Sequence, residues 1–447
     1  MNKLLKIKKG LDLNLAGAIS DKSVAVSIKS GRLAVVPDDF PGLTPRLDVK
    51  EGDKVAKGQS LAHDKTHEEI KLCSPVSGIV SSIIRGERRK ILSVIIDADD
   101  TNDEIIFNLT QNPDKGEIRH ILLESGLWSR LRQLPYDIVP HPEREPRDIF
   151  VTAFDSAPLA GDLLKNPSVN QENIKAGVEA LKKLTKGKVY ISARENFPYS
   201  CENAELITIQ GPHPAGLPSI QAGNIKPINK GETVWMLDIV TLSKIGELIS
   251  SGQYSTETLV AVTGSEISDP HYVLTTEGAE IESLIKDSIA PGDKNRRIIS
   301  GNVLSGKKTE KTEFLRFPHR QITVIPEGND KDEFMGWASI SPSKLSASRS
   351  YPLSRFKAIF SPDARLNGGK RAMIMSGLYD RMIPLDIMAE YLIKAVLSRN
   401  IEKMEQLGIY EVSPEDFALA EFVDPSKLEL QKIIRSGLDY MRKETED

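Results

Sequence analysis

The amino-acid sequence predicts a multidomain α/β protein, and three observations support this prediction. A length of 447 residues gives a prior of about three domains. The first part is rich in short strands separated by glycine turns, the middle alternates apolar strands with helices, and the last part is helical. Repeats of solenoid length and low-complexity segments are absent from the sequence.

Charge and cysteine content exclude several classes of protein. The chain has 59 Lys and Arg against 63 Asp and Glu, a formal net charge of −4, which is too balanced for a typical nucleic-acid-binding protein. Its two cysteines, Cys73 and Cys201, are too few for a disulfide framework, an all-cysteine zinc site or a cysteine-ligated iron–sulfur cluster. We therefore expect no metal site in this chain.

No stretch reaches the roughly 18 consecutive apolar residues of a membrane-spanning helix. The first twenty residues are basic, but Asp12 and Asn14 interrupt any apolar signal-peptide core. These features predict a cytoplasmic protein whose association with a membrane would be peripheral.

The sequence of the first module predicts two similar strand-rich halves. Residues Val49–Leu61 and Cys73–Ile83 each carry apolar anchors around a glycine turn, and Arg89–Asp99 adds a closing strand. This pattern resembles the biotinyl/lipoyl-like barrel-sandwich hybrid. The connecting segment Ala62–Leu72 lacks the two methionines that flank a modified lysine, and Lys65 is displaced, so a carrier function is not favoured.

A Rossmann-like α/β domain follows. Apolar spacing predicts a helix over 115–134, and the prolines of 135–148 predict a surface linker. The apolar strand Ile149–Phe154 then begins a pattern of strands alternating with helices, which is typical of a sheet covered on both faces. No G-x-G-x-x-G follows a strand, so the dinucleotide fingerprint is missing.

A small α+β unit and a helical region complete the chain. In the unit, a helix over 279–289 combines with short strands in a β-grasp-like (SLBB-like) arrangement. Gly301–Lys308 is one mismatch from a P-loop, but Lys308 replaces the hydroxyl residue, which favours a hairpin turn. In the helical region, Asp424 and Pro425 are predicted to begin the last helix. The predicted domains are 1–35 (an N-terminal strand segment), 36–105 (barrel-sandwich hybrid), 106–265 (Rossmann-like), 266–335 (β-grasp-like, SLBB-like) and 336–447 (C-terminal helical).

Three groups of polar residues have a functional and a structural interpretation each. His213, in a loop that follows an apolar strand, would be either a hydrogen-bond donor to a cleft or part of a connector. A histidine and glutamate group matches no strong metal-binding spacing, and a basic run would be either a solvated turn or a docking site for a partner or anionic lipid. These two groups are His63, His67, Glu68 and Glu69, and Arg85, Arg88, Arg89 and Lys90.

Seven segments, in order along nearly the whole chain, resemble one family. They are KIKKGLDLNLAG (6–17), RGERR (85–89), Glu124–Asp162, GPHPAGLP (211–218), RRIISGNVLSG (296–306), LYDRMIPLDI (378–387) and Leu407–Lys427. Together they are similar to the NqrA family, which provides one of the subunits of the bacterial Na⁺-translocating NADH:quinone reductase.

The resemblance implies a peripheral subunit on the cytoplasmic side of the bacterial inner membrane. Its partners would be subunits B to F of a six-subunit complex, which reduces ubiquinone to ubiquinol and exports Na⁺. NADH, FAD, FMN and the iron–sulfur centre would be bound by those other subunits, and the isolated chain would not catalyse the reaction.

Distant relatives of the family, in respiratory complex I and the Rnf complex, bind FMN and an iron–sulfur cluster, and this sequence departs from both motifs. Where they have a glycine-rich loop, it has Trp128, Arg130 and Arg132; where they have clustered cysteines, it has Ala420–Lys427. Bulky side chains prevent close approach of backbone to a phosphate. We therefore expect no redox cofactor and no catalytic residue in this chain.

The family's link to quinones gives four candidate site residues. A quinone headgroup needs an apolar cleft and donors to its carbonyl oxygens. His213 would supply a donor, Asp155 an orienting carboxylate, and Phe154 or Trp235 a stacking wall. Core packing would explain both aromatic residues equally well. The alternative function is structural, in the assembly of the complex, with no small-molecule site.

Overall fold

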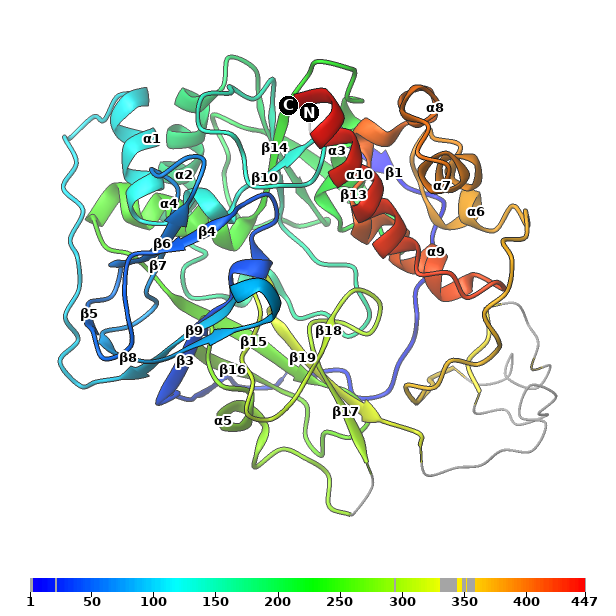
Figure 1. The fold of residues 1–447 in the computed structure, drawn as a ribbon, viewed down its shortest axis with the longest axis horizontal. Helices are drawn as coiled ribbons and strands as arrows, with labels where there is room; N and C mark the ends of the chain where they lie inside the picture. Colours follow the sequence, from blue (N-terminus) through cyan, green and yellow to red (C-terminus); the bar gives the residue numbers. More distant parts are fainter. Residues whose placement is uncertain are drawn as a thin grey trace.

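The computed structural model describes residues 3–20, 22–292, 295–329, 344–347, 351 and 358–446. Four sheets, of six, six, four and three strands, form three strand-rich parts, and the C-terminal helices lie to one side of them (Figure 1). The N-terminal segment joins these parts: β1 (Lys3–Lys6), β2 (Val26–Ser27) and β3 (Arg32–Val35) belong to three different sheets.

The predicted barrel-sandwich hybrid is confirmed. One sheet has the order β3-β9-β8-β5 and the other β4-β6-β7, and all their pairings are antiparallel. Alternate residues point inward, where Val80, Val94 and Ile96 are at most 1% exposed. The strands are β4 (Pro45–Leu47), β5 (Lys54–Val55), β6 (Ser60–Asp64), β7 (Lys71–Cys73), β8 (Gly78–Arg85) and β9 (Ile91–Ala98).

The second part is an α/β sheet with helices on both faces. Its order is β1-β13-β12-β11-β14-β10, and every pairing is parallel except that of β10 with β14. Helices α2 and α4 pack on one face, while α3 and the C-terminal helices pack on the other. The elements are β10 (Arg132–Leu134), β11 (Ile149–Thr152), α2 (Gln171–Leu184), β12 (Val189–Ala193), β13 (Glu205–Gln210), α3 (Pro218–Ile225), β14 (Val234–Asp238) and α4 (Ile239–Ser251).

Two predictions for the start of this domain were wrong. The helix predicted over 115–134 ends early: α1 is Lys115–Glu124, a 3₁₀ turn follows at Trp128–Arg130, and β10 comes next. Gly126 has a φ of +76°, a left-handed conformation that terminates the helix. Residues 135–148 are no surface linker, because much of this segment is buried, including Tyr136, Ile138 and Val139.

The third part contains the second six-stranded sheet, with the order β18-β17-β19-β15-β16-β2. Its helix, α5, is Ile281–Ile285, shorter than the predicted 279–289. The predicted hairpin turn at Gly301–Lys308 is confirmed, because β17 and β18 pair antiparallel on either side of it. The strands are β15 (Glu257–Thr263), β16 (His271–Thr276), β17 (Arg296–Ser300), β18 (Lys307–Thr309) and β19 (Gln321–Pro326).

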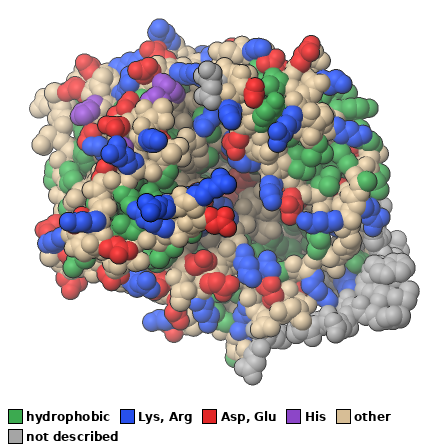
Figure 2. Space-filling model, viewed as in Figure 1, with side chains coloured by type: hydrophobic (Ala, Val, Ile, Leu, Met, Phe, Trp, Pro, Cys, Tyr) green, Lys and Arg blue, Asp and Glu red, His purple; other side chains and the backbone are tan. Residues whose placement is uncertain are grey.

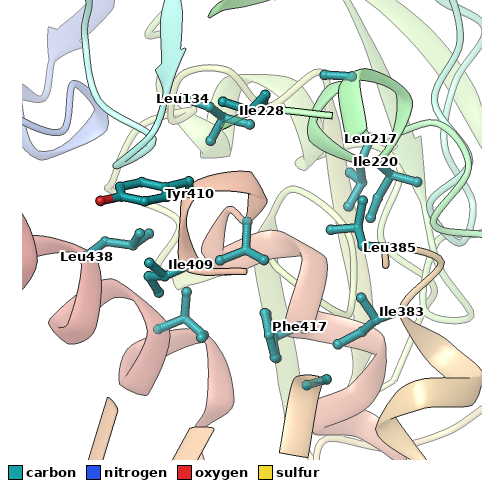
Figure 3. Packing of buried hydrophobic residues seen from close by; sticks show 14 of the residues in the cluster. Leu134, Leu217, Ile220, Ile228, Ile383, Leu385, Ile409, Tyr410, Phe417 and Leu438 are labelled. Atoms are coloured by element: carbon teal, nitrogen blue, oxygen red, sulfur yellow. The ribbon is translucent and has the colours of Figure 1, made fainter. Parts of the chain in front are cut away.

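The C-terminal helices share a core with the α/β sheet. Leu385, Ile409 and Phe417 pack in the same cluster as Leu217 and Ile220, at the start of α3 (Figure 3). The helices are α6 (Tyr379–Met382), α7 (Ala389–Leu397), α8 (Ile401–Gln406), α9 (Ala418–Val423) and α10 (Leu430–Glu446). Within the described ranges, no helix has the length and apolar character needed to cross a membrane.

The predicted start of the last helix was wrong. Asp424 instead follows α9, and its carboxylate accepts hydrogen bonds from the backbone N–H groups of Ser426 and Leu428. The last helix begins six residues later, at Leu430, because this turn intervenes.

Buried charges join the α/β part to the third part. Glu277, directly after β16, forms ion pairs with Arg130 of the 3₁₀ turn and, at 2.6 Å, with Lys244 of α4. Lys244 is completely buried and the Arg130 side chain is 8% exposed. Arg130 also donates a hydrogen bond to the Tyr254 hydroxyl at 2.9 Å. Burial acts to raise the pKa of Glu277, but the two cations outweigh it and lower this pKa to about 2.

We predict that Glu277→Gln strongly destabilises the protein. The substitution leaves Lys244 and Arg130 buried without a counter-charge, which costs about 3–5 kcal/mol. Urea denaturation would measure this loss in the free energy of unfolding. Glu280→Gln is the matched control, because Glu280 pairs with the half-exposed Arg32 and its loss costs about 1 kcal/mol or less. Equal losses in the two variants would contradict the prediction.

Candidate functional site

The candidate site is a cleft at the carboxyl ends of two neighbouring strands, β11 and β14. From β11 the chain crosses through α2 to β12 on one side, whereas β14, on the other side, is reached from β13 through α3. Crossovers that diverge in this way leave a crevice at the strand ends, which is where open α/β sheets bind ligands.

The cleft encloses about 400 Å³. Figure 2 shows a hollow near the middle of the face in view, with charged side chains around it. All parts of the chain contribute to its walls: Asp38 and Asp39 lie between β3 and β4 of the barrel-sandwich hybrid, Asn302 and Lys307 come from the third part, and Glu415 belongs to the C-terminal helical region. The site therefore forms only when the four parts are assembled.

One wall of the cleft is apolar. Phe154 follows β11, and Leu163, Leu217, Met236 and Phe317 also line the cavity. The guanidinium carbon of Arg194 lies 4.2 Å from the centroid of the Phe154 ring, which orients the ring by a cation–π contact. These side chains offer flat and aliphatic surfaces to a ligand.

Polar groups lie at the strand ends. Asp238 ends β14 and caps α4, accepting a hydrogen bond from the backbone N–H of Thr241 at 2.7 Å, and its other oxygen pairs with Arg320. Two buried donors on residues that line the cleft, Nδ2 of Asn166 and Nε of Arg320, have no hydrogen-bond partner. Buried donors are normally paired, so these two are candidates to donate to a ligand.

Two carboxyl groups with raised pKa values, from different parts of the chain, also line the cleft. Burial raises the pKa of Asp155, which follows Phe154. Burial also raises the pKa of Glu415 to about 7, and the Ser305 hydroxyl donates to its Oε1 at 2.6 Å. Glu415 can therefore hold or release a proton near neutral pH.

The structure places two of the four residues proposed from the sequence at the cleft. Phe154 and Asp155 line the cleft, but His213 and Trp235 are not among its lining residues. Trp235 points to the other face of the sheet, where its ring centroid lies 5.0 Å from that of Trp128 in an edge-to-face contact.

His213 is a buried structural histidine, 2% exposed. Its Nδ1 lies 3.1 Å from the Ser156 hydroxyl, whose oxygen accepts a hydrogen bond from the backbone N–H of Gly216. An alanine Cβ at position 216 would lie 2.5 Å from the Ser156 nitrogen, so only glycine permits this approach of the two loops. Burial lowers the pKa of His213 to about 4. His213 thus holds the loop that positions Asp155.

Asn166, Arg320 and Glu415 were missed by sequence reasoning. Each lies in a segment with no local motif, and the fold alone brings them to the cleft. Asp238 did carry a signal, since a carboxylate between an apolar strand and a helix marks a strand end at this edge of the sheet.

No metal site is found in the described part of the chain. No group of three or more His, Cys, Asp or Glu side chains is close enough there to hold a metal ion. His63 lies 2.6 Å from Asp48, and the His67 ring packs edge-on against His141. The two cysteines are free, and burial raises the pKa of Cys73 to about 12.

The bulky residues at the expected flavin-phosphate loop are part of the core. Trp128 is 1% exposed, and its indole N–H donates to the Pro140 carbonyl at 2.8 Å. Arg132 donates to three backbone carbonyls, including that of Asp39 at 2.6 Å. Contacts within the protein therefore hold Trp128, Arg130 and Arg132 in place.

Comparison with known proteins identifies related sequences over the whole chain. Residues 5–99 match the NqrA N-terminal barrel-sandwich hybrid domain, residues 113–254 the NqrA second alpha/beta domain, and residues 259–311 the NQRA C-terminal domain, an SLBB model. The chain is 35% identical to the NqrA component of the Na(+)-translocating NADH-quinone reductase of Neisseria meningitidis serogroup B, covering 99% of this chain and 100% of the relative. It is 36% identical to the corresponding protein of Hahella chejuensis, with the same coverage.

Among solved structures, an NAD+-reducing [NiFe]-hydrogenase in the air-oxidized state is 10% identical, with a TM-score of 0.35. The match covers 74% of this chain and 61% of that chain.

We predict that Glu415→Gln changes how stability depends on pH. The folded-state pKa of about 7 exceeds the ordinary 4.5, so the folded protein holds the proton more tightly and loses stability as pH rises from about 4.5 to 7. The variant lacks this loss, so between pH 5 and pH 8 it gains about 2–3 kcal/mol relative to the unsubstituted chain. Denaturant unfolding at both pH values would test this, and a pH-independent difference would contradict it.

Proposed function

Since the chain belongs to the NqrA family of the Na⁺-translocating NADH-quinone reductases, we propose that its cleft binds the ubiquinone headgroup for that complex. It does so as a peripheral subunit on the cytoplasmic side of the membrane, with subunits B to F as its partners. The observation that carries this proposal is the cleft at the β11 and β14 strand ends, where aromatic walls meet two unpaired buried donors.

The residues fit the chemistry of a quinone. A flat ring packs against Phe154 and Phe317, and its carbonyl oxygens accept hydrogen bonds from Asn166 and Arg320. Reduction of a quinone to a quinol takes up two electrons, which come from NADH through the complex, and two protons. Glu415, with its pKa near 7, holds one of those protons beside the ring.

The charge of the cleft favours a neutral ligand over a nucleotide. Seven carboxyl groups line it, those of Asp38, Asp39, Asp137, Asp155, Asp162, Asp238 and Glu415, against four basic groups, those of Arg130, Arg132, Lys307 and Arg320. Burial raises the pKa of Asp137, Asp155 and Glu415, and the four other carboxylates balance the four basic groups, so no net positive charge is left to attract the phosphates of FMN, FAD or NADH. This supports our proposal that the chain binds none of these cofactors and no iron–sulfur centre, and that other subunits carry them.

The alternative function is structural, in the assembly of the complex, without a ligand. The number of ionisable groups in the cleft favours it, because a quinone headgroup prefers a largely dry, apolar site. The two proposals differ in whether the isolated chain binds a quinone.

We predict that the purified chain binds a short-chain ubiquinone saturably and that Phe154→Ala or Asn166→Asp weakens binding at least about tenfold. Loss of the aromatic wall removes stacking contacts, and Asn166→Asp keeps the acceptor for the Ser168 N–H but removes the amide donor. Isothermal titration calorimetry would measure the dissociation constants.

Phe197→Ala is the control for this experiment. Phe197 is a half-buried aromatic residue that packs edge-on against Tyr199 and does not line the cleft. It should leave quinone binding unchanged. Absence of saturable binding by the unsubstituted chain would favour the assembly function, and a bound flavin in the purified chain would overturn the proposal that it carries no cofactor.

A further inference from the structure

The turn between β8 and β9 carries a concentrated positive charge. It presents Arg85, Arg88, Arg89 and Lys90, all of them exposed, against one acidic residue, Glu87. Arg88 and Arg89 have φ angles of 52° and 61°, in the left-handed region that non-glycine residues rarely adopt. We call residues 84–92 the basic hairpin.

The three arginines of the basic hairpin form no ion pair with any residue that the structure describes. Lys90 pairs with Asp38 at 2.7 Å, but among the described residues no carboxylate lies within ion-pair distance of Arg85, Arg88 or Arg89. The only side-chain hydrogen bond they make to the described part of the protein runs from Arg85 to the Arg89 carbonyl. Three unpaired arginines within five residues repel one another, and an anionic surface would remove that repulsion.

Aliphatic side chains lie beside these arginines. Along β8 and β9, Ile83 and Ile91 point into the core of the module, whereas Ile84 and Leu92 point outward and are 42% and 37% exposed. An exposed turn that combines arginines with aliphatic side chains is the composition of a segment that lies at the surface of an anionic bilayer.

We propose that the basic hairpin docks on the anionic phospholipid surface of the membrane. Its guanidinium groups pair with lipid phosphates, for which a planar donor pair is well suited, while Ile84 and Leu92 enter the headgroup layer. A lipid surface fits better than an acidic protein segment, because these side chains project from the tip of a turn and form no groove that would hold a peptide.

The position of the basic hairpin relates docking to the cleft. The Lys90–Asp38 ion pair joins the hairpin to the cleft, because Asp38 is one of the cleft-lining residues. In Figure 2, Lys and Arg side chains gather beside the hollow, over the part of the face where Figure 1 shows β8 and β9. Docking of the basic hairpin would hold the opening of the cleft near the lipid that contains ubiquinone. This consequence rests on the proposed function, whereas the docking of the hairpin does not.

Vesicle flotation of the full-length chain tests the proposal. The unsubstituted chain should bind vesicles containing about 30% phosphatidylglycerol, but not pure phosphatidylcholine vesicles, although its net charge of −4 opposes binding to an anionic surface. Combining Arg85→Ser, Arg88→Ser and Arg89→Ser should weaken binding about 100-fold, at about fivefold for each arginine. Salt at about 0.5 M should also release the protein, since exposed charges are then screened.

The matched control removes three other exposed cations, by Lys175→Ser, Lys286→Ser and Lys311→Ser, and should bind like the unsubstituted chain. Equal weakening in both triple variants, equal binding to neutral and anionic vesicles, or no vesicle binding would each overturn the proposal. If no form of the chain bound vesicles and the arginine variant failed to assemble with the partner subunits, the basic hairpin would be a protein interface. Quinone titration without lipid should be unchanged in the arginine variant, so failure of the cleft proposal is measured separately.

Discussion

The buried carboxylate of Glu277 is the constraint on which the arrangement of the molecule depends. Two cations of the α/β part, Lys244 and Arg130, are buried at its junction with the third part, and Glu277 of the third part is the counter-charge for both. A buried pair of this kind contributes little net stability over an apolar replacement, but it tolerates no loss of one partner. It therefore favours one relative placement of these two parts over others that hydrophobic packing alone would permit.

Asp39 reinforces this arrangement at the edge of the cleft. Its carboxylate, 4% exposed, accepts hydrogen bonds from Arg316 and from the backbone N–H of Phe317 at 2.9 Å, and its carbonyl accepts one from Arg132. The Phe317 ring then stacks on Phe40 and receives the guanidinium of Arg130 at 5.1 Å. Because these contacts join segments from three parts, the walls of the cleft are positioned by ionic and aromatic contacts and not by one continuous core.

Sequence reasoning could predict elements whose signals are local, and failed where the signal depends on tertiary contacts. Glycine turns and alternating apolar residues were sufficient for the barrel-sandwich hybrid, and continuous apolar runs were sufficient for β11 and β14. In contrast, Leu127 and Leu131 are buried as a helical pattern predicts, but a 3₁₀ turn and the approach to β10 bury them. The rule for strand ends could predict Phe154 and Asp155, whereas Asn166 and Arg320 reach the cleft only because the topology brings their segments to it.

The cleft and the basic hairpin lie close together but differ in charge, so they favour different kinds of ligand. Inside the cleft, carboxylates outnumber basic groups, and Arg320 is paired with Asp238, so little positive charge is left to attract a phosphate. On the basic hairpin, next to Asp38, three arginines are unpaired among the described residues and are free to attract phosphates. A lipid-soluble ligand with a neutral ring fits this charge distribution. Its ring would enter the cleft, while the phosphates of the surrounding bilayer would remain outside, at the basic hairpin. A nucleotide does not fit this distribution, because the basic hairpin would attract its phosphates whereas the cleft has no net positive charge to bind them. This charge pattern is the one that the proposed binding of a neutral quinone ring requires.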